Sequence, residues 1–289
     1  MEFGQRDGRV VPRQIDALLP KEMARRAERI GTEKAEQASL NLLVLGTLAG
    51  AFVAFGATFA AAVTAGADTA SSPGLVKLAG GVTFSLAYVL AIVGGAELFT
   101  TNNLMVMAWA HGRLKTVRLL RAWSIVFAGN LVGTVSTAAL MILAGQHAQM
   151  GGSVGAGLLS TAAYIDGLGL FDGFLLGILG NTLLCLGVWL TYSARTTTDR
   201  IMALMLPVAA FYVLGFEHAI AVMFYVPCAI LIDVIAQPDF WILIDREPIG
   251  ITLPSFFRVL VSVTAGNIVG GGVLVALVYW FAYLRQGRT

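Results

Sequence analysis

The sequence predicts an all-α, polytopic membrane protein with six transmembrane helices, built as two inverted three-helix repeats whose second and fifth helices are broken. The first observation is composition: of 289 residues, 57% are hydrophobic and 12% are charged, whereas soluble domains carry roughly 25% charged residues. The second is patterning, because several apolar runs exceed the ~18 residues typical of a helix that crosses a bilayer. The third is a repeat of motifs between the two halves. Together they exclude a soluble globular protein.

The apolar runs define six spans, and the charges between them define an orientation. Of the 19 Lys and Arg residues, 16 lie before the first span, in the segments 111–121 and 195–200, or in the C-terminal tail. The positive-inside rule makes this side cytoplasmic. We therefore expect a multi-pass protein of the inner (plasma) membrane with both termini in the cytoplasm. The spans are predicted at residues 39–65, 74–110, 117–144, 171–194, 201–235 and 254–284.

Two cytoplasmic segments, residues 1–38 and 285–289, flank the transmembrane domain of residues 39–284. The first has no apolar stretch typical of a cleaved signal peptide. We expect its part from 12 to 38 to form an interfacial helix on the cytoplasmic leaflet, with a solvated charged helix as the alternative. The apolar side chains that share one face of this helix are Ile15, Leu18, Leu19, Met23 and Ile30.

Matching motifs in the two halves predict an inverted repeat. The third span contains AGNLVG around Asn130, and the sixth contains AGNIVG around Asn267. The second span carries GAE ending at Glu97, and the fifth carries GFE ending at Glu217. Because each half holds three spans, the copies must have opposite topologies. Glycine-interrupted spans at matching places indicate a substrate path near the middle of the membrane.

The glutamates and the adjacent His218 are the candidate functional groups of these broken spans. A break frees backbone groups that hydrocarbon cannot satisfy, and a carboxylate near a helix N-terminus can accept bonds from such amides. We therefore interpret Glu97 and Glu217 as pins of the broken helices, with proton-relay carboxylates as the alternative. An ionisable residue inside the membrane indicates function, so we expect His218 to line a pore. The alternative is a buried histidine with a purely structural role.

Four stretches of the sequence resemble the formate/nitrite transporter family, and most closely its formate branch, over roughly residues 35–284: AELFTTNNLMVMAW, GNTLLCLGVWLTYSARTTTDRI, GFEHAIAVMFYVP and GNIVGGGVLVALVYWF. The resemblance implies a homopentamer of six-helix, aquaporin-like protomers with one pore each. It implies transport of a small monocarboxylate or inorganic anion, most simply formate, with no cofactor, no metal and no nucleic-acid partner. Nitrite and hydrosulfide are alternative substrates, followed by acetate and lactate.

The resemblance also implies roles for single residues. Leu98, Phe99 and Thr100 match the mobile loop at the cytoplasmic constriction, and Thr100 matches the threonine that hydrogen-bonds to the central histidine, here His218. The other matches are to the outer apolar constriction (Phe84 and Phe211) and to an asparagine near the outer vestibule (Asn181).

Three departures from the family pattern stand out. Val222 occupies a position that is commonly asparagine, and Tyr88 stands where an apolar gate residue often sits. The region 161–172 offers no base where many members have a vestibule lysine. These departures bear on how an anion is attracted and which anion is carried.

A histidine at the centre suits the transport of a weak acid. A bare carboxylate in an apolar constriction costs several kcal/mol. An acid with a pKa near ~4 is only about one part in a thousand neutral at pH 7, and histidine changes charge near that pH. We therefore expect the acid to cross protonated or together with a proton, and we expect replacement of His218 to alter the pH dependence of flux.

Other classes of function have weaker support. Gly151–Gly155 matches the G-x-S-x-G pattern of hydrolases around Ser153, but we expect it in a glycine-rich outer loop, with no strand before it and no helix start after it. His111, His147 and His218 are too far apart for a local metal motif. The free cysteines Cys185 and Cys228 fall inside apolar spans. A structural or sensor protein would not require a Glu-His pair in a broken span.

Overall fold

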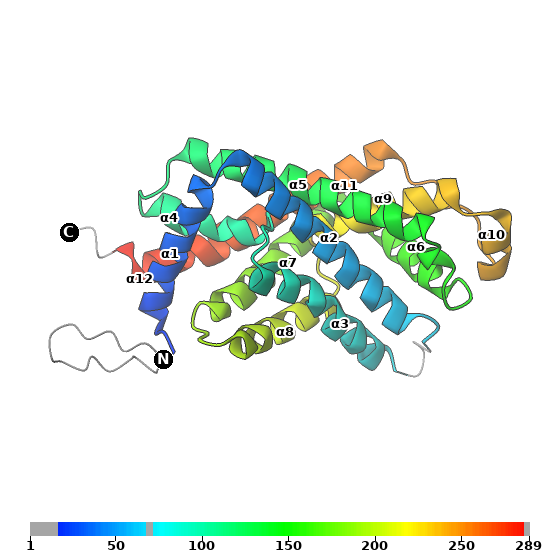
Figure 1. Cartoon of the computed structure of the whole chain (residues 1–289), viewed down its shortest axis with the longest axis horizontal. Coiled ribbons are helices and arrows are strands. Elements are labelled where there is room, and N and C mark those ends of the chain that lie inside the picture. Colours follow the sequence, from blue (N-terminus) through cyan, green and yellow to red (C-terminus); the bar gives the residue numbers. More distant parts are fainter. Residues whose placement is uncertain (1–16, 68–71, 286–289) are drawn as a thin grey trace, which may run out of the picture.

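A computed structural model describes residues 17–67 and 72–285, and within them every regular element is helical (Figure 1). The short elements are η1 (Thr101–Met105), η2 (Gln146–Ala148) and the π-helical η3 (Ile268–Leu277). The α-helices are α1 (Pro20–Glu36), α2 (Ser39–Thr64), α3 (Pro73–Gly94), α4 (Val106–Ala110), α5 (Thr116–Leu143), α6 (Ser153–Asp166), α7 (Leu170–Thr191), α8 (Thr197–Val213), α9 (Ala219–Ile235), α10 (Pro238–Ile244), α11 (Leu253–Asn267) and α12 (Val278–Tyr283).

Among the described residues, five helical stretches are long and apolar enough to cross a membrane: α2, α3, α5, α7, and the continuous run from α11 to α12 over Leu253–Tyr283. A sixth arises if α9 and α10, bent by 118° at their junction, are taken as one span. Large apolar side chains lie exposed along these helices, for example Phe55, Leu140 and Phe257. The protein is therefore a multi-pass membrane protein.

Both predicted interruptions are present, and each begins with a glycine in the left-handed conformation. Helix α3 ends at Gly94, and Gly95 follows with φ +80°. Helix α8 ends at Val213, and Gly215 has φ +66° before α9 begins at Ala219. A residue with a Cβ is strained at such φ values. These glycines therefore allow the chain to leave each helix sharply.

Two pairs of helices cross closely because glycines remove the side chains between them. A Cβ on Gly133 of α5 would overlap the carbonyl oxygen of Thr47 on α2. A Cβ on Gly266 of α11 would overlap the carbonyl oxygen of Phe174 on α7. Small residues at helix contacts are the usual way in which helices pack within a membrane. The α2–α5 and α7–α11 contacts are thus built alike.

The segment after α5 differs from the predicted loop. It contains α6, which begins at Ser153, so the expectation that no helix starts there is wrong. The helix forms because its side chains at helical spacing, including Val154, Leu158 and Ala162, are buried, with α6 packed against α9. No strand precedes Ser153 in the described residues, and none of their histidines bonds to its hydroxyl.

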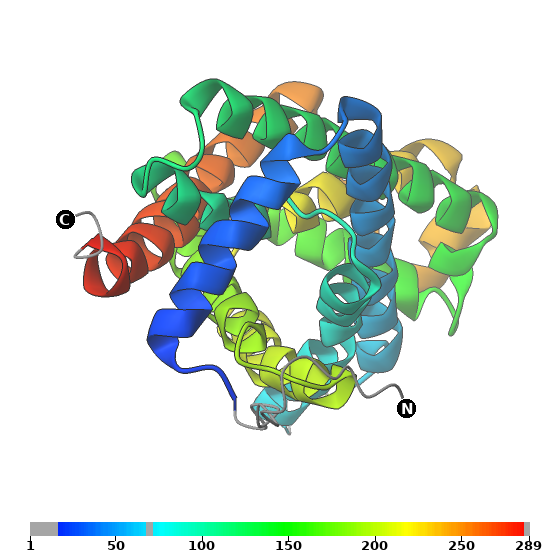
Figure 2. The same ribbon diagram turned by 60° about the vertical axis from the view of Figure 1, so that its left-hand side comes forward.

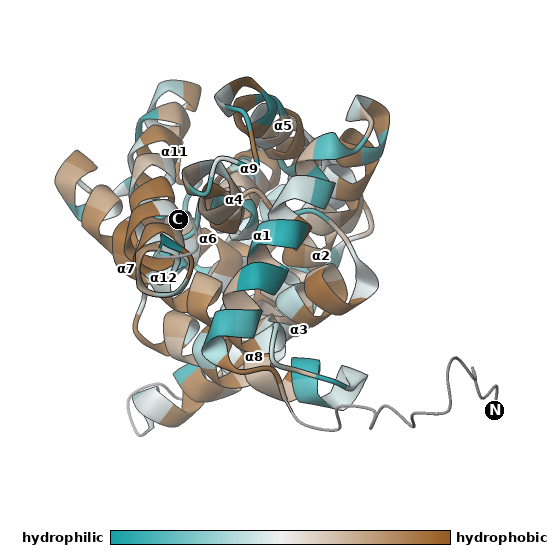
Figure 3. Ribbon diagram, turned by 90° about the vertical axis from the view of Figure 1, so that its left-hand side faces the viewer, coloured by the Kyte–Doolittle hydropathy of each residue, from teal (hydrophilic) through white to brown (hydrophobic). Residues whose placement is uncertain are grey.

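Helix α1 packs across one end of the helix bundle (Figures 2 and 3). Its buried face consists mainly of small residues, and Gly31 lies against the backbone of Met105. Of the side chains predicted to share one apolar face, Met23 is buried and Leu19 is 69% exposed, and Ile15 lies outside the described residues. The polar side of α1 faces outward in Figure 3. Helix α12 and α4 lie at the same end as α1 (Figure 1).

Candidate functional site

The loop that follows α3 is held by one asparagine from α5. The side-chain amide of Asn130 donates to the carbonyl oxygens of Gly46 and Glu97, both at 2.8 Å. Its Oδ1 accepts a bond of 2.9 Å from the backbone N–H of Phe99. Asn130 is fully buried. One side chain thus satisfies the Glu97 carbonyl and the Phe99 N–H, which the break leaves without helical partners, and ties the loop to α2 through Gly46.

The loop that follows α8 is held in the same way by Asn267 from α11. Its amide donates to the carbonyl oxygens of Gly177 at 2.8 Å and Glu217 at 3.2 Å. Its Oδ1 accepts a bond of 2.9 Å from the N–H of Ala219. The repeat of AGN motifs marked both asparagines, but their role as pins was not recognised in the sequence. Both loops are thus held by asparagine side chains, and the roles of Glu97 and Glu217 as pins stay predictions.

The two glutamates have different surroundings. The carboxylate of Glu97 accepts bonds from Lys34 Nζ at 2.9 Å and from the Asn102 amide at 2.8 Å. Glu217 is 6% exposed, and no ion pair to it is present in residues 17–67 and 72–285. Glu97 therefore joins its loop to α1, an interaction that the spacing of the sequence does not reveal.

His218 lies where the two loops meet, fully buried at the N-cap of α9. Its Nδ1 accepts a bond of 3.2 Å from the N–H of Ala221. Its Nε2 lies 2.7 Å from Thr100 Oγ1 and 2.9 Å from the Tyr88 hydroxyl. The predicted pairing of Thr100 with His218 is present in this geometry, and Tyr88 adds a second hydroxyl.

These contacts fix the roles of the two ring nitrogens. Because Nδ1 accepts from a backbone N–H, the hydrogen of the neutral imidazole must be on Nε2. The Nε2–H then points at the oxygens of Thr100 and Tyr88. Each hydroxyl can accept this bond and still donate its own hydrogen elsewhere. The centre of the site can therefore offer two hydroxyl donors to an anion.

Aromatic rings surround the histidine on the α3 and α8 sides. Phe84 and Phe211 stack with ring centroids 6.2 Å apart, and Phe211 lies edge-on to His218 at 6.2 Å. Tyr88 follows Phe84 by one helical turn, so it lies about 6 Å further along α3. Both phenylalanines are buried. An apolar layer thus lies next to the polar centre.

The loop residues before Thr100 are also apolar and buried. Leu98 is fully buried. The ring of Phe99 packs edge-on against Trp123 and Phe127 of α5, at 5.7 and 5.0 Å. The ring of Phe99 therefore packs on α5, and its backbone N–H is bonded to Asn130 of the same helix.

Asn181 and Val222 lie next to this centre. The Asn181 amide donates to the carbonyl oxygens of Thr100 at 3.1 Å and of Asn267 at 2.8 Å. Asn181 thus positions Thr100, and its place near the outer vestibule stays a prediction. Val222 is fully buried, and its N–H donates to the His218 carbonyl in the first turn of α9.

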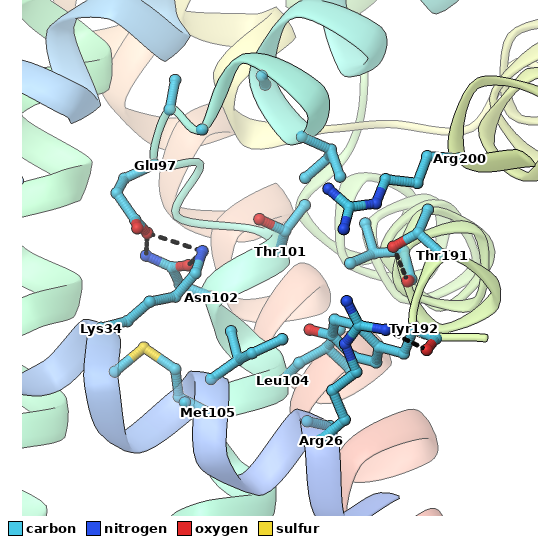
Figure 4. A pocket seen from close by; sticks show the side chains of 18 residues that line it. Arg26, Lys34, Glu97, Thr101, Asn102, Leu104, Met105, Thr191, Tyr192 and Arg200 are labelled. Atoms are coloured by element: carbon cyan, nitrogen blue, oxygen red, sulfur yellow. Dashed lines mark hydrogen bonds and ion pairs between the residues drawn. The ribbon is translucent and has the colours of Figure 1, made fainter. Parts of the chain in front are cut away.

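A pocket of about 160 Å³ lies next to α1. Figure 4 shows Arg26 and Lys34 entering it from α1, Arg200 from the first turn of α8, and Glu97 from the loop after α3. The region 161–172, which contains no lysine or arginine, is bonded to Arg258 of α11. Its guanidinium donates to the carbonyl oxygens at positions 166 and 168, each at 2.6 Å. In the described ranges, no three metal-ligating side chains gather.

The sequence model of the formate/nitrite transporter family matches residues 21–281. The chain belongs to this family. The formate channel FocA of Escherichia coli strain K12 is 40% identical over 276 residues, which cover 94% of this chain and 96% of FocA. The formate channel FocA of Haemophilus influenzae is 36% identical and covers 90% of this chain and 93% of its own.

Solved structures support the same assignment. A pentameric formate channel with formate bound superimposes with a TM-score of 0.79 at 37% identity, over 86% of this chain and 98% of that one. An FNT family ion channel gives a TM-score of 0.74 at 26% identity, over 91% and 98% of the two chains. This member of the formate/nitrite transporter family therefore shares both the sequence and the fold of transport proteins, and its relatives are channels rather than enzymes.

Proposed function

We propose that the protein is a formate channel. The observation that carries the proposal is the polar group of His218, Thr100 and Tyr88, enclosed by apolar residues where two broken helices meet. The relatives named formate channels support formate as the anion. Formate is small enough to interact with two neighbouring hydroxyls at once.

In this proposal the polar centre replaces water at the narrowest part of the path. The rings of Phe84 and Phe211 on one side and Leu98 on the other exclude water, which makes a bare carboxylate costly. The hydroxyls of Thr100 and Tyr88 donate to the carboxylate oxygens while they accept from the imidazole. The acid crosses the apolar layers together with a proton.

A proton on the second ring nitrogen of His218 would face the N–H of Ala221, so charging the ring breaks that bond. Protonation of the histidine is thereby coupled to the first turn of α9. This coupling is how we propose that flux follows pH.

The experiment that tests the function is a substrate panel in proteoliposomes. Uptake of formate, nitrite, hydrosulfide, acetate and lactate is followed across a pH series, with empty liposomes as the control. The proposal expects the fastest protein-dependent flux for formate. Faster nitrite flux would favour the second candidate, a nitrite channel, which the family description supports. Absence of flux for every anion would refute transport.

We propose that the chain crosses the inner (plasma) membrane six times, in two inverted repeats, with both termini in the cytoplasm. The matched roles of Asn130 and Asn267 and the matched α2–α5 and α7–α11 contacts support the repeat. The charged end that carries α1 supports the orientation. In whole cells, a single cysteine placed at position 21 should resist a membrane-impermeant thiol reagent, and one placed at Lys77 should react.

We further propose a homopentamer, on the basis of the pentameric relative and the exposed apolar side chains on the long helices. Native mass spectrometry should give five times the chain mass of 30.5 kDa. A monomer as the only species would contradict the pentamer.

The proposed domain organisation has three parts. Residues 1–38 form a cytoplasmic segment in which α1 lies at the interface with lipid, residues 39–284 form the channel domain, and residues 285–289 form a cytoplasmic tail.

A further inference from the structure

Two arginines converge in the pocket at the α1 end. Arg26 reaches it from α1 and Arg200 from the first turn of α8 (Figure 4). These residues are 174 positions apart in sequence. The wall between them includes Thr191 and Tyr192, at the end of α7. The pocket thus lies between α1 and the α7–α8 turn.

Neither arginine has a carboxylate partner within 4.0 Å among the described residues. The Arg26 guanidinium donates one bond, to the Tyr192 carbonyl oxygen at 3.0 Å, and no side-chain bond of Arg200 is present in that part of the chain. The single acid in the pocket wall, Glu97, is already bonded to Lys34. Both guanidinium groups line this one pocket, and burial and the nearby charge of Arg200 lower the pKa of Arg26.

We propose that this pocket binds a small oxyanion, which bridges Arg26 and Arg200. Guanidinium groups bind carboxylate and phosphate oxygens with paired N–H donors, and two guanidinium groups that face one pocket repel each other until an anion neutralises them. About 160 Å³ is enough for a single small ion of this class.

The bridging anion also fastens the N-terminal half of α1. The ion pairs that tie α1 to the rest of the protein are made by Lys34, Glu28 and Glu36, in its second half. In the first half, the bond of Arg26 to Tyr192 is the one side-chain bond to the body in the described residues. An anion on Arg26 and Arg200 would hold α1 against the α7–α8 turn, across the opening of the pocket.

The test is hydrogen exchange of the backbone of residues 20–33 in the purified full-length protein. Sodium formate and sodium phosphate are compared with sodium chloride at equal ionic strength. At an anion concentration ten times the Kd, protection of α1 should rise about tenfold. Arg200→Gln should abolish this rise without unfolding the protein, because Arg200 makes no side-chain bond in the described structure. Arg25→Gln and Arg29→Gln are matched controls, because both residues are on the exposed side of α1, and both should respond as the wild type does.

A rise in the protection of α1 with formate alone identifies the transported anion as the ligand, and this conclusion rests on the proposed function. A rise in protection with phosphate identifies a ligand that is independent of the proposed function. Either result supports the site. An equal rise in Arg200→Gln, or no rise with either anion in the wild type, overturns it. Formate flux is measured separately, so a protein without flux would refute the proposed function and leave the exchange result unchanged.

Discussion

Replacing Asn130 with alanine should loosen one loop and leave its counterpart intact. The substitution leaves the Phe99 N–H without an acceptor and the carbonyls of Gly46 and Glu97 without the asparagine donor. A buried polar group that loses its partner costs about 1–3 kcal/mol. The Phe99 N–H and the Glu97 carbonyl lie in the loop and have no helical partner, whereas the Gly46 carbonyl lies within α2. The two loop groups together cost at least about 2 kcal/mol, which corresponds to a change of about 30-fold in the opening equilibrium of the loop.

Hydrogen exchange measured by mass spectrometry separates the two loops. In Asn130→Ala, exchange of residues 95–103 should accelerate by about 30-fold, while exchange of residues 215–222 should stay as in the wild type. Asn267→Ala should give the reverse. Thr134→Ala is the matched control, because this hydroxyl bonds only to carbonyls of its own helix. Equal acceleration of both loops in either variant, or none in either, would refute the assignment of the asparagines as separate pins.

Three further substitutions test other parts of the structure. Tyr88→Phe keeps the ring but removes one hydroxyl donor, so we expect the half-saturating formate concentration in liposomes to rise about tenfold. An unchanged value would show that this hydroxyl does not bind the anion. Gly50→Ala places a Cβ against a carbonyl oxygen of α5, so we expect the free energy of unfolding to fall by about 2 kcal/mol or more. The loss should appear as a lower melting temperature in detergent, and an unchanged Tm would contradict the close crossing of α2 and α5. Lys34→Met leaves the Glu97 carboxylate buried without its ammonium partner, which costs about 3 kcal/mol. Hydrogen exchange of residues 95–103 should therefore rise, and unaltered exchange would show that α1 does not hold the loop.

The sequence is sufficient to predict the helix breaks and an all-helical membrane protein. Gly95 and Gly215 stand out because a glycine followed by an acid is unusual in an apolar run, and both have the positive φ that such a break needs. The repeated AGN motif also pointed to Asn130 and Asn267. Local pattern therefore identified where the chain departs from the helix and which residues recur.

The partners of the buried polar groups could not be read in the same way. Lys34 meets Glu97 across 63 positions, and Tyr88 meets His218 across 130. Such contacts depend on how helices cross, which no local spacing encodes. The sequence predicts glutamates as the pins because a carboxylate is a strong acceptor, but an asparagine can donate and accept at once. The broken loops present both carbonyls and amides, so the amide side chain fits them better.

Helix α6 was missed for a related reason. Its sequence is rich in glycine, serine and alanine, which resembles a loop composition. Its buried stripe, which includes Val154 and Leu158, becomes decisive only when α9 lies against it. Tertiary packing thus overrides weak local preference.

The most direct test of the central role of His218 is formate uptake into proteoliposomes by the wild type and by His218→Asn between pH 5 and 8, the range in which histidine changes its charge. The amounts of reconstituted protein are matched, and Arg29→Gln serves as a surface control. We predict that the wild type and the control show the same pH-dependent uptake, and that His218→Asn loses this pH dependence. The same pH profile in His218→Asn as in the wild type would contradict a transport path governed by this imidazole.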